Sequence, residues 1–190
     1  MAGSGLTLRS VRRSGGTLLL LAALTLLWLY PEWFGLGAAE TRSANGGMIV
    51  VRDGDTLTIG TLDYRLHGID APEYSQICKD ESGLDWPCGK AARLALEALV
   101  KGHSIICEVR ARDNYGRAVA TCRDELGRDL SRAMAEQGLA VSFGGFGEGP
   151  YADEEGEAKA AKRGLWRGSF EPPASWRADH PRGAKGGTSS

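Results

Sequence analysis

Three short segments of this 190-residue chain concentrate side chains that could do chemistry together. The segments are DGDT at residues 53–56, RLHGIDAPE at residues 65–73 and DNYGR at residues 113–117. Within them, three acids and two arginines are the candidates for one site: Asp55, Asp70, Glu73, Arg65 and Arg117. Carboxylates that converge repel one another unless a cation or a proton lies between them. We therefore expect a cation to share the site with the acids.

The types of these side chains limit the chemistry. Oxygen ligands without cysteine or histidine favour a hard cation such as Ca²⁺ or Mg²⁺ over zinc. Each arginine can donate two parallel hydrogen bonds to a phosphate. The alternative is structural, because each segment taken singly is also a common turn or strand exit. His67 lies among them and is expected to be a partly buried structural histidine. The combination predicts a site that binds a metal ion and a phosphate.

Short runs rich in Val, Ile, Leu and Tyr predict the strands that must position these residues. There are five such runs, at residues 48–51, 57–60, 64–69, 103–112 and 117–122. Apolar or charge periodicity predicts three helices, at residues 89–102, 129–138 and 153–163. The pattern indicates an α+β fold, a five-stranded, partly open β-barrel of the oligonucleotide/oligosaccharide-binding (OB) type with about three helices.

One feature of the pattern conflicts with a shared site. Arg65 and Asp70 are an odd number of residues apart, so they would point to opposite faces of a regular strand. Gly68 could host a β-bulge that brings them to one face. We therefore expect a bulge at Gly68.

The N-terminus has the order of a signal sequence. Three arginines, Arg9, Arg12 and Arg13, precede an apolar run at residues 17–30. As a helix this run spans about 21 Å, which is short for a hydrocarbon core about 30 Å thick. The aromatic residues at its end favour an uncleaved membrane anchor, and a cleaved signal peptide is the alternative. In both cases the folded domain is expected outside the cytoplasm, in the periplasm, at the cell surface or secreted.

This pattern divides the chain into five parts. They are a basic flank at residues 1–16, the anchor or signal peptide at 17–37, a linker at 38–47, the folded domain at 48–177 and a disordered tail at 178–190.

The four cysteines have no zinc-site spacing, and an exported chain meets oxidising conditions. A hairpin that turns at residues 113–116 places Cys107 directly opposite Cys122, within disulfide range. Cys78 and Cys88 form the other expected pair. Buried free thiols are the alternative.

The charge balance excludes a broadly basic surface for nucleic acid, because 23 basic residues face 24 acidic ones. The sequence contains no sign of an obligate protein partner, and we expect a monomer.

Four segments taken in order, VRDGDTLTI, YRLHGIDAPE, DNYGRAVATC and RGLW, resemble the staphylococcal nuclease (thermonuclease) family. The resemblance extends from about Ile49 to Arg177. It implies the same OB-type barrel with three helices. It also implies a calcium-dependent phosphodiesterase, an endonuclease that cuts DNA and RNA and leaves 3′-phosphate ends.

The resemblance also implies roles for individual residues. Asp55 and Asp70 look like the calcium carboxylates, with the backbone carbonyl of Ala71 as a further ligand. Glu73 looks like the group that orients or deprotonates the attacking water, and Arg65 and Arg117 look like the phosphate clamp.

The chain departs from the family in two segments. The stacking tyrosines of the family fall in VSFGGFGEGPY, where Phe143 and Phe146 are the nearest matches and Tyr151 is a further one. The loop at residues 74–88 is expected beside the site. Two other readings stay open: a non-catalytic module on the same fold that binds nucleic acid or protein, and a phosphodiesterase that acts on small nucleotides.

Overall fold

The computed structural model describes residues 14–30, 40–143 and 148–181, and divides into two units, residues 1–39 and 40–190. In the first unit, helix α1 spans Ser14–Leu29, and its leucine side chains are exposed. It therefore covers most of the predicted apolar run, whereas residues 31–37 of the predicted anchor lie outside the described residues. None of the helices in the described ranges has the combined length and apolarity needed to cross a membrane.

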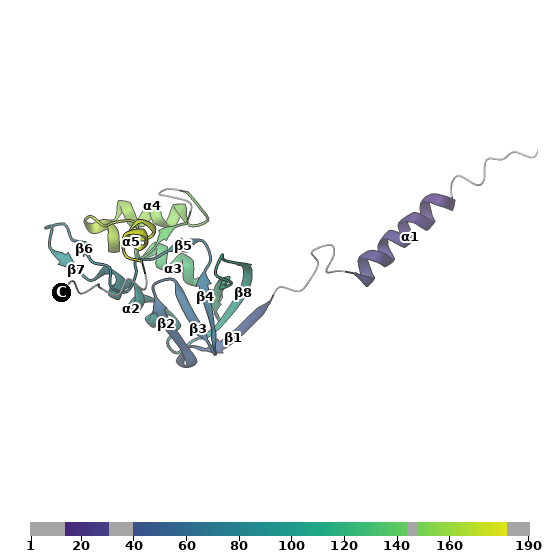
Figure 1. The fold of residues 1–190 in the computed structure, drawn as a ribbon, viewed down its shortest axis with the longest axis horizontal. Helices are drawn as coiled ribbons and strands as arrows, with labels where there is room; N and C mark the ends of the chain where they lie inside the picture. Colours follow the sequence, from purple (N-terminus) through teal and green to yellow (C-terminus); the bar gives the residue numbers. More distant parts are fainter. Residues whose placement is uncertain (1–13, 31–39, 144–147, 182–190) are drawn as a thin grey trace, which may run out of the picture. The chain divides into compact units, whose positions relative to one another are not determined.

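The second unit is built on one curled sheet (Figure 1). Its strand order is β1-β8-β9-β4-β3-β2, in which β4 and β9 are parallel and the other neighbours are antiparallel. The strands are β1 (Thr41–Asn45), β2 (Ile49–Asp53), β3 (Thr56–Ile59), β4 (Leu62–Leu66), β8 (Ser104–Arg112) and β9 (Ala118–Asp124). The predicted α+β class is confirmed, and the curled sheet is consistent with an OB-like fold.

Strand β1 lies in the segment that the sequence analysis assigned to a linker, residues 38–47. Its small and polar side chains give little strand signal, but its backbone pairs with β8 from Thr41↔Glu108 to Asn45↔Ser104. The folded unit therefore begins at Glu40 rather than at Met48. A short 3₁₀ turn, η2 (Gly46–Met48), then connects β1 to β2.

Helices pack against this sheet at one side of the unit (Figure 1). The described helices are α2 (Cys88–Val100), α3 (Leu130–Glu136), α4 (Ala152–Ala160), the 3₁₀ helix η3 (Gly164–Arg167) and α5 (Pro173–Asp179). Helix α2 buries Ala92, Leu96 and Leu99 on one stripe, and α2 contacts β2. The three predicted helices are present. Helix α5 was not predicted, and it starts at Pro173, a residue whose fixed φ suits a first helical turn.

The core lies between the sheet and α2 and α3. Its large, fully buried side chains include Leu57, Tyr64, Leu66, Leu96, Ile105, Leu130 and Met134. Burying a side chain of this size stabilises a fold by about 1.5–3 kcal/mol. The core therefore gives a rigid base to the turns at the ends of β2, β4 and β9, where the candidate residues lie.

Two short strand pairs lie outside the main sheet. Strand β5 (Ile69–Asp70) pairs with β10 (Val141–Ser142), and β6 (Cys78–Lys79) pairs with β7 (Asp85–Trp86). Both expected cysteine pairs are disulfide-bonded in the structure. Cys107 and Cys122 are directly opposed on β8 and β9 with Cα atoms 4.1 Å apart, and Cys78–Cys88 links β6 to the start of α2.

Candidate active site

Asp55 occupies a buried turn between β2 and β3. Its carboxylate accepts hydrogen bonds from the Thr56 hydroxyl at 2.9 Å and from the Ala71 amide at 3.2 Å. Gly54 allows this turn to approach the core, because a Cβ there would come within 2.7 Å of the Cβ atoms of Ala71 and Ala92. The DGDT segment is therefore a turn, as its composition indicates, but a turn that fixes a carboxylate with 2% exposure.

Asp70 reaches the same site because the strand that carries Arg65 is interrupted. Strand β4 ends at Leu66, Gly68 has a φ of +80°, and β5 then begins at Ile69. A Cβ at Gly68 would lie 2.5 Å from Pro150 Cγ and 2.8 Å from the Tyr151 ring. The expected bulge is thus replaced by a break, after which the chain leaves the main sheet and pairs with β10.

Arg65 lies between the two aspartates. Its Nη2 atom is 2.8 Å from Asp55 Oδ2 and 2.5 Å from Asp70 Oδ1. The two carboxylates therefore direct oxygens toward one point, and a positive group occupies that point. Burial raises the pKa of Asp55 to about 6, although the Arg65 guanidinium opposes the shift.

A third arginine, Arg177 on α5, joins this cluster. Its Nη2 donates to Asp70 Oδ2 at 3.0 Å, and its Nη1 lies 2.9 Å from Asp70 Oδ1 and 3.5 Å from Glu73 Oε1. Burial opposes the charged form, but the hydrogen bond to Asp70 and the nearby carboxylates raise the pKa of Arg177. From the sequence, Arg177 marked only the end of the predicted domain. The signal was faint, because 107 residues separate it from Asp70.

Glu73 is held at the edge of the cluster by the loop that follows Pro72. The Glu73 amide donates to Gln76 Oε1 at 3.3 Å, and the Glu73 carbonyl accepts from the Gln76 amide at 2.8 Å. Gln76 is fully buried and also donates through Nε2 to the Glu171 carbonyl at 2.7 Å. One side chain therefore ties the Glu73 loop to the segment that leads into α5.

Arg117 lies at the β8–β9 turn and binds Asp113 of that turn rather than Asp55 or Asp70. Its Nε donates to Asp113 Oδ2 at 2.6 Å, and its guanidinium lies 5.6 Å from the centre of the Tyr115 ring. Burial alone would raise the pKa of Asp113, but the hydrogen bonds from Arg117 and Tyr115 outweigh it and lower this pKa. The structure thus brings Arg117 to the site as part of a hydrogen-bonded turn.

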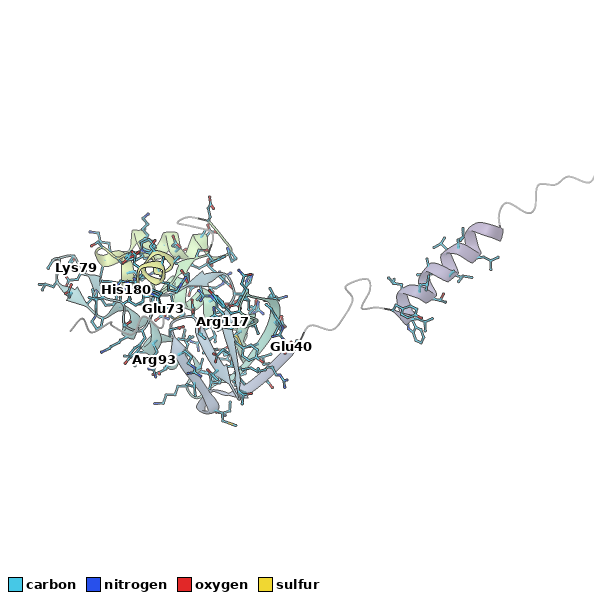
Figure 2. All side chains as sticks on the ribbon, in the orientation of Figure 1. Glu40, Glu73, Lys79, Arg93, Arg117 and His180 are labelled. Carbon is cyan, nitrogen blue, oxygen red and sulfur yellow. A yellow bond between two sulfur atoms is a disulfide. The ribbon has the colours of Figure 1, made fainter. Side chains whose placement is uncertain are left out.

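Among the cavities beside these residues, two are lined by both Arg65 and Arg177. One, of about 700 Å³, is lined by residues that include Arg65, Glu73, Arg117, Trp176 and His180. Glu73, Arg117 and His180, which all line this cavity, are labelled in Figure 2. The other cavity, of about 470 Å³, is lined by residues that include Phe143 and His67. Arg65, Arg117, Arg177 and Tyr115 line both.

Of the three predicted base-stacking residues, the two that the structure describes differ in their exposure. Phe143 is 64% exposed beside the smaller cavity, where its ring is accessible. Tyr151 is only 6% exposed, and its hydroxyl donates to Asp129, so it is a core residue and cannot stack on a base. Phe146 lies outside the described residues. Tyr115, which the sequence analysis did not single out, is 86% exposed beside both cavities.

The donor set of the cluster fits a hard cation in part. The Asp55 and Asp70 oxygens converge, and the Ala71 backbone lies beside them because its amide binds Asp55. Oxygen donors of this kind suit Ca²⁺. Across the described ranges, however, no three acidic, histidine or cysteine side chains are grouped as a metal site. A cation bound by Asp55 and Asp70 would therefore lie next to Arg65 and would need oxygen ligands besides these two carboxylates.

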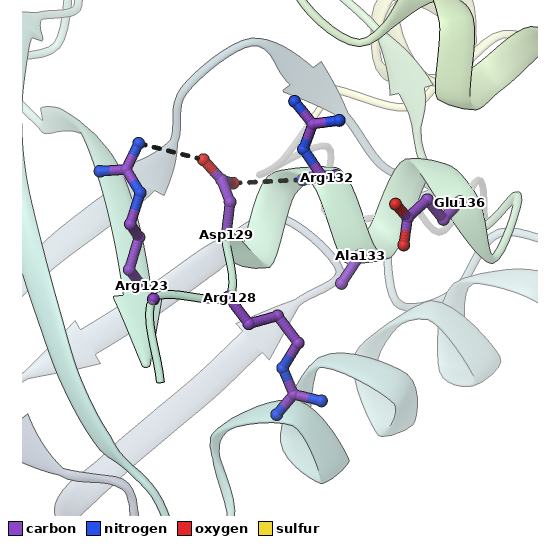
Figure 3. A pocket seen from close by; sticks show the side chains of 7 residues that line it. Arg123, Arg128, Asp129, Arg132, Ala133 and Glu136 are labelled. Atoms are coloured by element: carbon purple, nitrogen blue, oxygen red, sulfur yellow. Dashed lines mark hydrogen bonds and ion pairs between the residues drawn. The ribbon is translucent and has the colours of Figure 1, made fainter. Parts of the chain in front are cut away.

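A separate group of arginines lies at the start of α3 (Figure 3). Arg123, Arg128 and Arg132 line a cavity of about 380 Å³ together with Asp129 and Glu136. Each of these arginines is paired with an acid: Arg123 with Asp129, Arg128 with Asp124 and Arg132 with Glu154. The positive charge is thus compensated locally, and this cavity contains none of the predicted site residues.

Comparison of the sequence with known proteins identifies the family that the four sequence segments resemble. Residues 63–168 match the protein family described as "Staphylococcal nuclease homologue". The succinoglycan biosynthesis protein ExoI of Rhizobium meliloti is 39% identical over 136 residues, which cover 71% of this chain and 70% of that protein.

Other relatives are longer proteins. The probable endonuclease LCL3 of Schizophyllum commune is 31% identical over 145 residues, which cover 67% of this chain and 48% of that protein. The probable staphylococcal-like nuclease CAN2 of Oryza sativa subsp. japonica is 37% identical over 119 residues, 60% of this chain and 29% of that protein. The chain therefore spans about half of the first of these and less than a third of the second.

Proposed function

Because the chain belongs to the family of staphylococcal nuclease homologues, we propose that it is a nuclease that hydrolyses phosphodiester bonds of DNA, RNA or both. One observation carries this proposal: Asp55, Arg65 and Asp70 meet at one point, beside Glu73. Relatives named as nucleases support it. The choice of DNA, RNA or both as substrate and the requirement for calcium are parts of this proposal.

In the proposed reaction, water attacks phosphorus, the bond to the 5′-oxygen breaks, and a 3′-phosphate remains. Glu73 orients the water and accepts its proton, because it lines the larger cavity, whereas Asp55 and Asp70 do not. Arg65 and Arg117 donate hydrogen bonds to the equatorial phosphate oxygens, where negative charge grows in the transition state. Arg117 approaches from a turn that Asp113 already holds in place.

Asp55 and Asp70 are the residues that would hold Ca²⁺, with the Ala71 carbonyl as a third oxygen ligand. A bound Ca²⁺ would supply a positive charge that polarises the phosphate and favours ionisation of water. Because the pKa of Asp55 is raised to about 6, a cation competes with a proton for this carboxylate, and cation binding should strengthen as the pH rises through this value.

Export of the domain is part of the proposal. The disulfides Cys78–Cys88 and Cys107–Cys122 support it, because such bonds persist in oxidising compartments. Residues 17–37 would act as the signal peptide or membrane anchor. Fractionation of cells that express the full chain, followed by immunoblotting, tests this part. Recovery of the protein in the cytoplasm with reduced cysteines would contradict it.

To test the nuclease proposal, the full chain is expressed with a protease site before Glu40, and residues 40–190 are released by cleavage at this site and purified. The released protein is then incubated with labelled single-stranded DNA. We expect cleavage with millimolar CaCl₂, no cleavage with a chelator, and products that carry a 3′-phosphate. A folded protein, shown by circular dichroism, that leaves DNA and RNA intact with calcium would contradict it. Cleavage of a nitrophenyl nucleotide ester without cleavage of either polymer would favour the small-nucleotide alternative.

A further inference from the structure

Helix α5 places an aromatic pair beside the arginines of the site. The rings of Trp176 and His180 are stacked, with centroids 4.3 Å apart and planes 11° from parallel. Both residues line the larger cavity together with Arg65, Glu73 and Arg117. Trp176 is partly exposed and His180 is exposed, so the pair is accessible from the cavity. None of the roles described so far uses this pair.

The position of α5 is fixed by the site itself. Arg177, next to Trp176, binds Asp70 with both of its terminal nitrogens. The segment before α5 is bound by Gln76, which also holds the Glu73 loop. These contacts tie α5, and with it the aromatic pair, to the residues that would bind and cut a phosphodiester.

The two cavities meet at the arginines. Arg65, Arg117 and Arg177 line both, whereas Phe143 lines only the smaller one and Trp176 only the larger one. A phosphodiester carries a nucleoside on each of its two sides. A phosphate bound at the shared arginines would therefore place one nucleoside toward each cavity. Their volumes, about 470 and about 700 Å³, are in the range of small-molecule sites.

Each cavity also has an aromatic surface of the kind that binds bases. Aromatic rings beside basic side chains hold single-stranded nucleic acids through stacking, with little preference for one base. Phe143 offers such a ring on one side. On the other side, Trp176 is stacked with His180, and both residues line the larger cavity, so this cavity also has an aromatic wall.

We propose that α5 forms a second nucleoside subsite, in which Trp176 stacks on the base at one side of the scissile phosphate. The inference rests on the proposed nuclease function and extends it, because it makes a strand of at least two unpaired nucleotides the preferred substrate. Bases inside a duplex are stacked on each other and cannot reach the indole. Single-stranded DNA or RNA is then cut faster than duplex.

The test compares a thymidine dinucleotide with two analogues, each lacking one of the two bases. We expect Trp176→Ala to lower kcat/KM for the intact dinucleotide by about tenfold, which corresponds to the loss of one stacked base. The loss should persist for one analogue and disappear for the analogue that lacks the base over Trp176. Trp176→Phe, which keeps a ring, should restore most of the activity.

Trp86→Ala is the matched control. It removes an indole that lies under Arg167, with 3.8 Å between the guanidinium carbon and the ring centre, and that lines neither cavity. Its kinetics should equal those of the parent protein. An equal loss for all three substrates in Trp176→Ala would show a merely structural role and overturn the subsite, as would no loss at all.

Calorimetric binding of the same three compounds without calcium separates this inference from the nuclease proposal. If neither these compounds nor single-stranded DNA and RNA are cleaved, the nuclease proposal fails. The subsite then stands if Trp176→Ala weakens binding of the intact dinucleotide but leaves binding of one of the two analogues unchanged. It falls if Trp176→Ala leaves binding of all three compounds unchanged.

Discussion

Arg65 and Asp70 are five residues apart, yet Arg65 Nη2 lies 2.5 Å from Asp70 Oδ1, because Gly68 interrupts the strand between them. In an uninterrupted strand the two side chains would point to opposite faces of the sheet. The left-handed φ of Gly68 and its contact with Tyr151 make glycine necessary at this position. The site therefore depends on a residue that has no reactive group.

Gly68→Ala should destabilise the protein and lower activity. The left-handed conformation alone costs roughly 1–2 kcal/mol for a residue with a Cβ, and the contact with Pro150 and Tyr151 adds to it. Gly102→Ala is the matched control, because Gly102 has the same φ of +80° and open space around it. Urea denaturation should show a larger loss of stability for Gly68→Ala, and activity should fall in that variant alone. Equal losses in both variants would contradict this reading.

Arg177→Gln should separate calcium binding from catalysis. Arg177 neutralises Asp70 and Glu73, so its removal takes away a cation that competes with Ca²⁺. We expect calorimetry to show calcium binding that is about threefold to tenfold tighter, a difference of about 1 kcal/mol. We also expect weaker binding of a phosphodiester, because one guanidinium is lost. Weaker calcium binding in this variant would show that Arg177 instead organises the metal ligands.

Asp55 should make the calcium-free protein less stable as the pH rises. Its pKa is 3.8 ordinarily and about 6 in the folded protein, chiefly because the carboxylate is buried. The folded state therefore binds more protons than the unfolded state between these values, so stability falls from about pH 4 to about pH 6 and is then constant. Since one pKa unit corresponds to about 1.4 kcal/mol, Asp55→Asn should stabilise the calcium-free protein at pH 8 by about 1–3 kcal/mol.

Asp113→Asn is the control of opposite sign. The pKa of Asp113 is lowered, so its charged form stabilises the fold above the ordinary pKa and this contribution is lost as the pH falls through the lowered value. Asp113→Asn should therefore destabilise the protein at pH 8. Urea denaturation in a chelator at several pH values measures both variants. A destabilising Asp55→Asn at pH 8 would contradict the account of Asp55.

Gln76→Ala should reduce turnover more than substrate binding. The variant leaves the Glu73 amide and the Glu171 carbonyl without their partner. An unpaired buried polar group costs about 1–3 kcal/mol, so thermal stability should fall. Because Glu73 would lose its orientation, kcat should fall further than KM rises. Gln137→Ala, which also removes an amide bonded to a main-chain carbonyl, should lose stability without this kinetic effect.

The sequence predicted the site residues that lie in turns with distinctive composition. DGDT, IDAPE and DNYGR each bring a charged residue to a strand end. Short runs rich in Val, Ile, Leu and Tyr predicted the strands around them, and helical periodicity predicted the helices. The opposition of Cys107 and Cys122 was also predicted from a turn at residues 113–116. At the tip, however, Arg112 pairs with Ala118, and an irregularity between Val109 and Ala111 restores the register at the cysteines.

Other features depend on contacts that no local pattern encodes. Strand β1 is held by its backbone pairing with β8, and its side chains carry little strand signal. Arg177 and Trp176 come to the site from a short helix near the end of the chain. Tyr151 lies in the core because Gly68 leaves room for its ring. Long-range packing decides these positions, so a single sequence could not predict them.

The most direct test of the account is single-turnover cleavage of single-stranded DNA by Glu73→Gln at saturating calcium. Glu81→Gln, a change at an exposed residue, serves as the control. We expect the Glu73→Gln rate to fall by a factor of about 10²–10⁴, the usual contribution of a general base, while calcium and DNA binding stay close to the parent values. The Glu81→Gln rate should be unchanged. Equal rates for Glu73→Gln and the parent protein would contradict the assignment of this site as the nuclease centre.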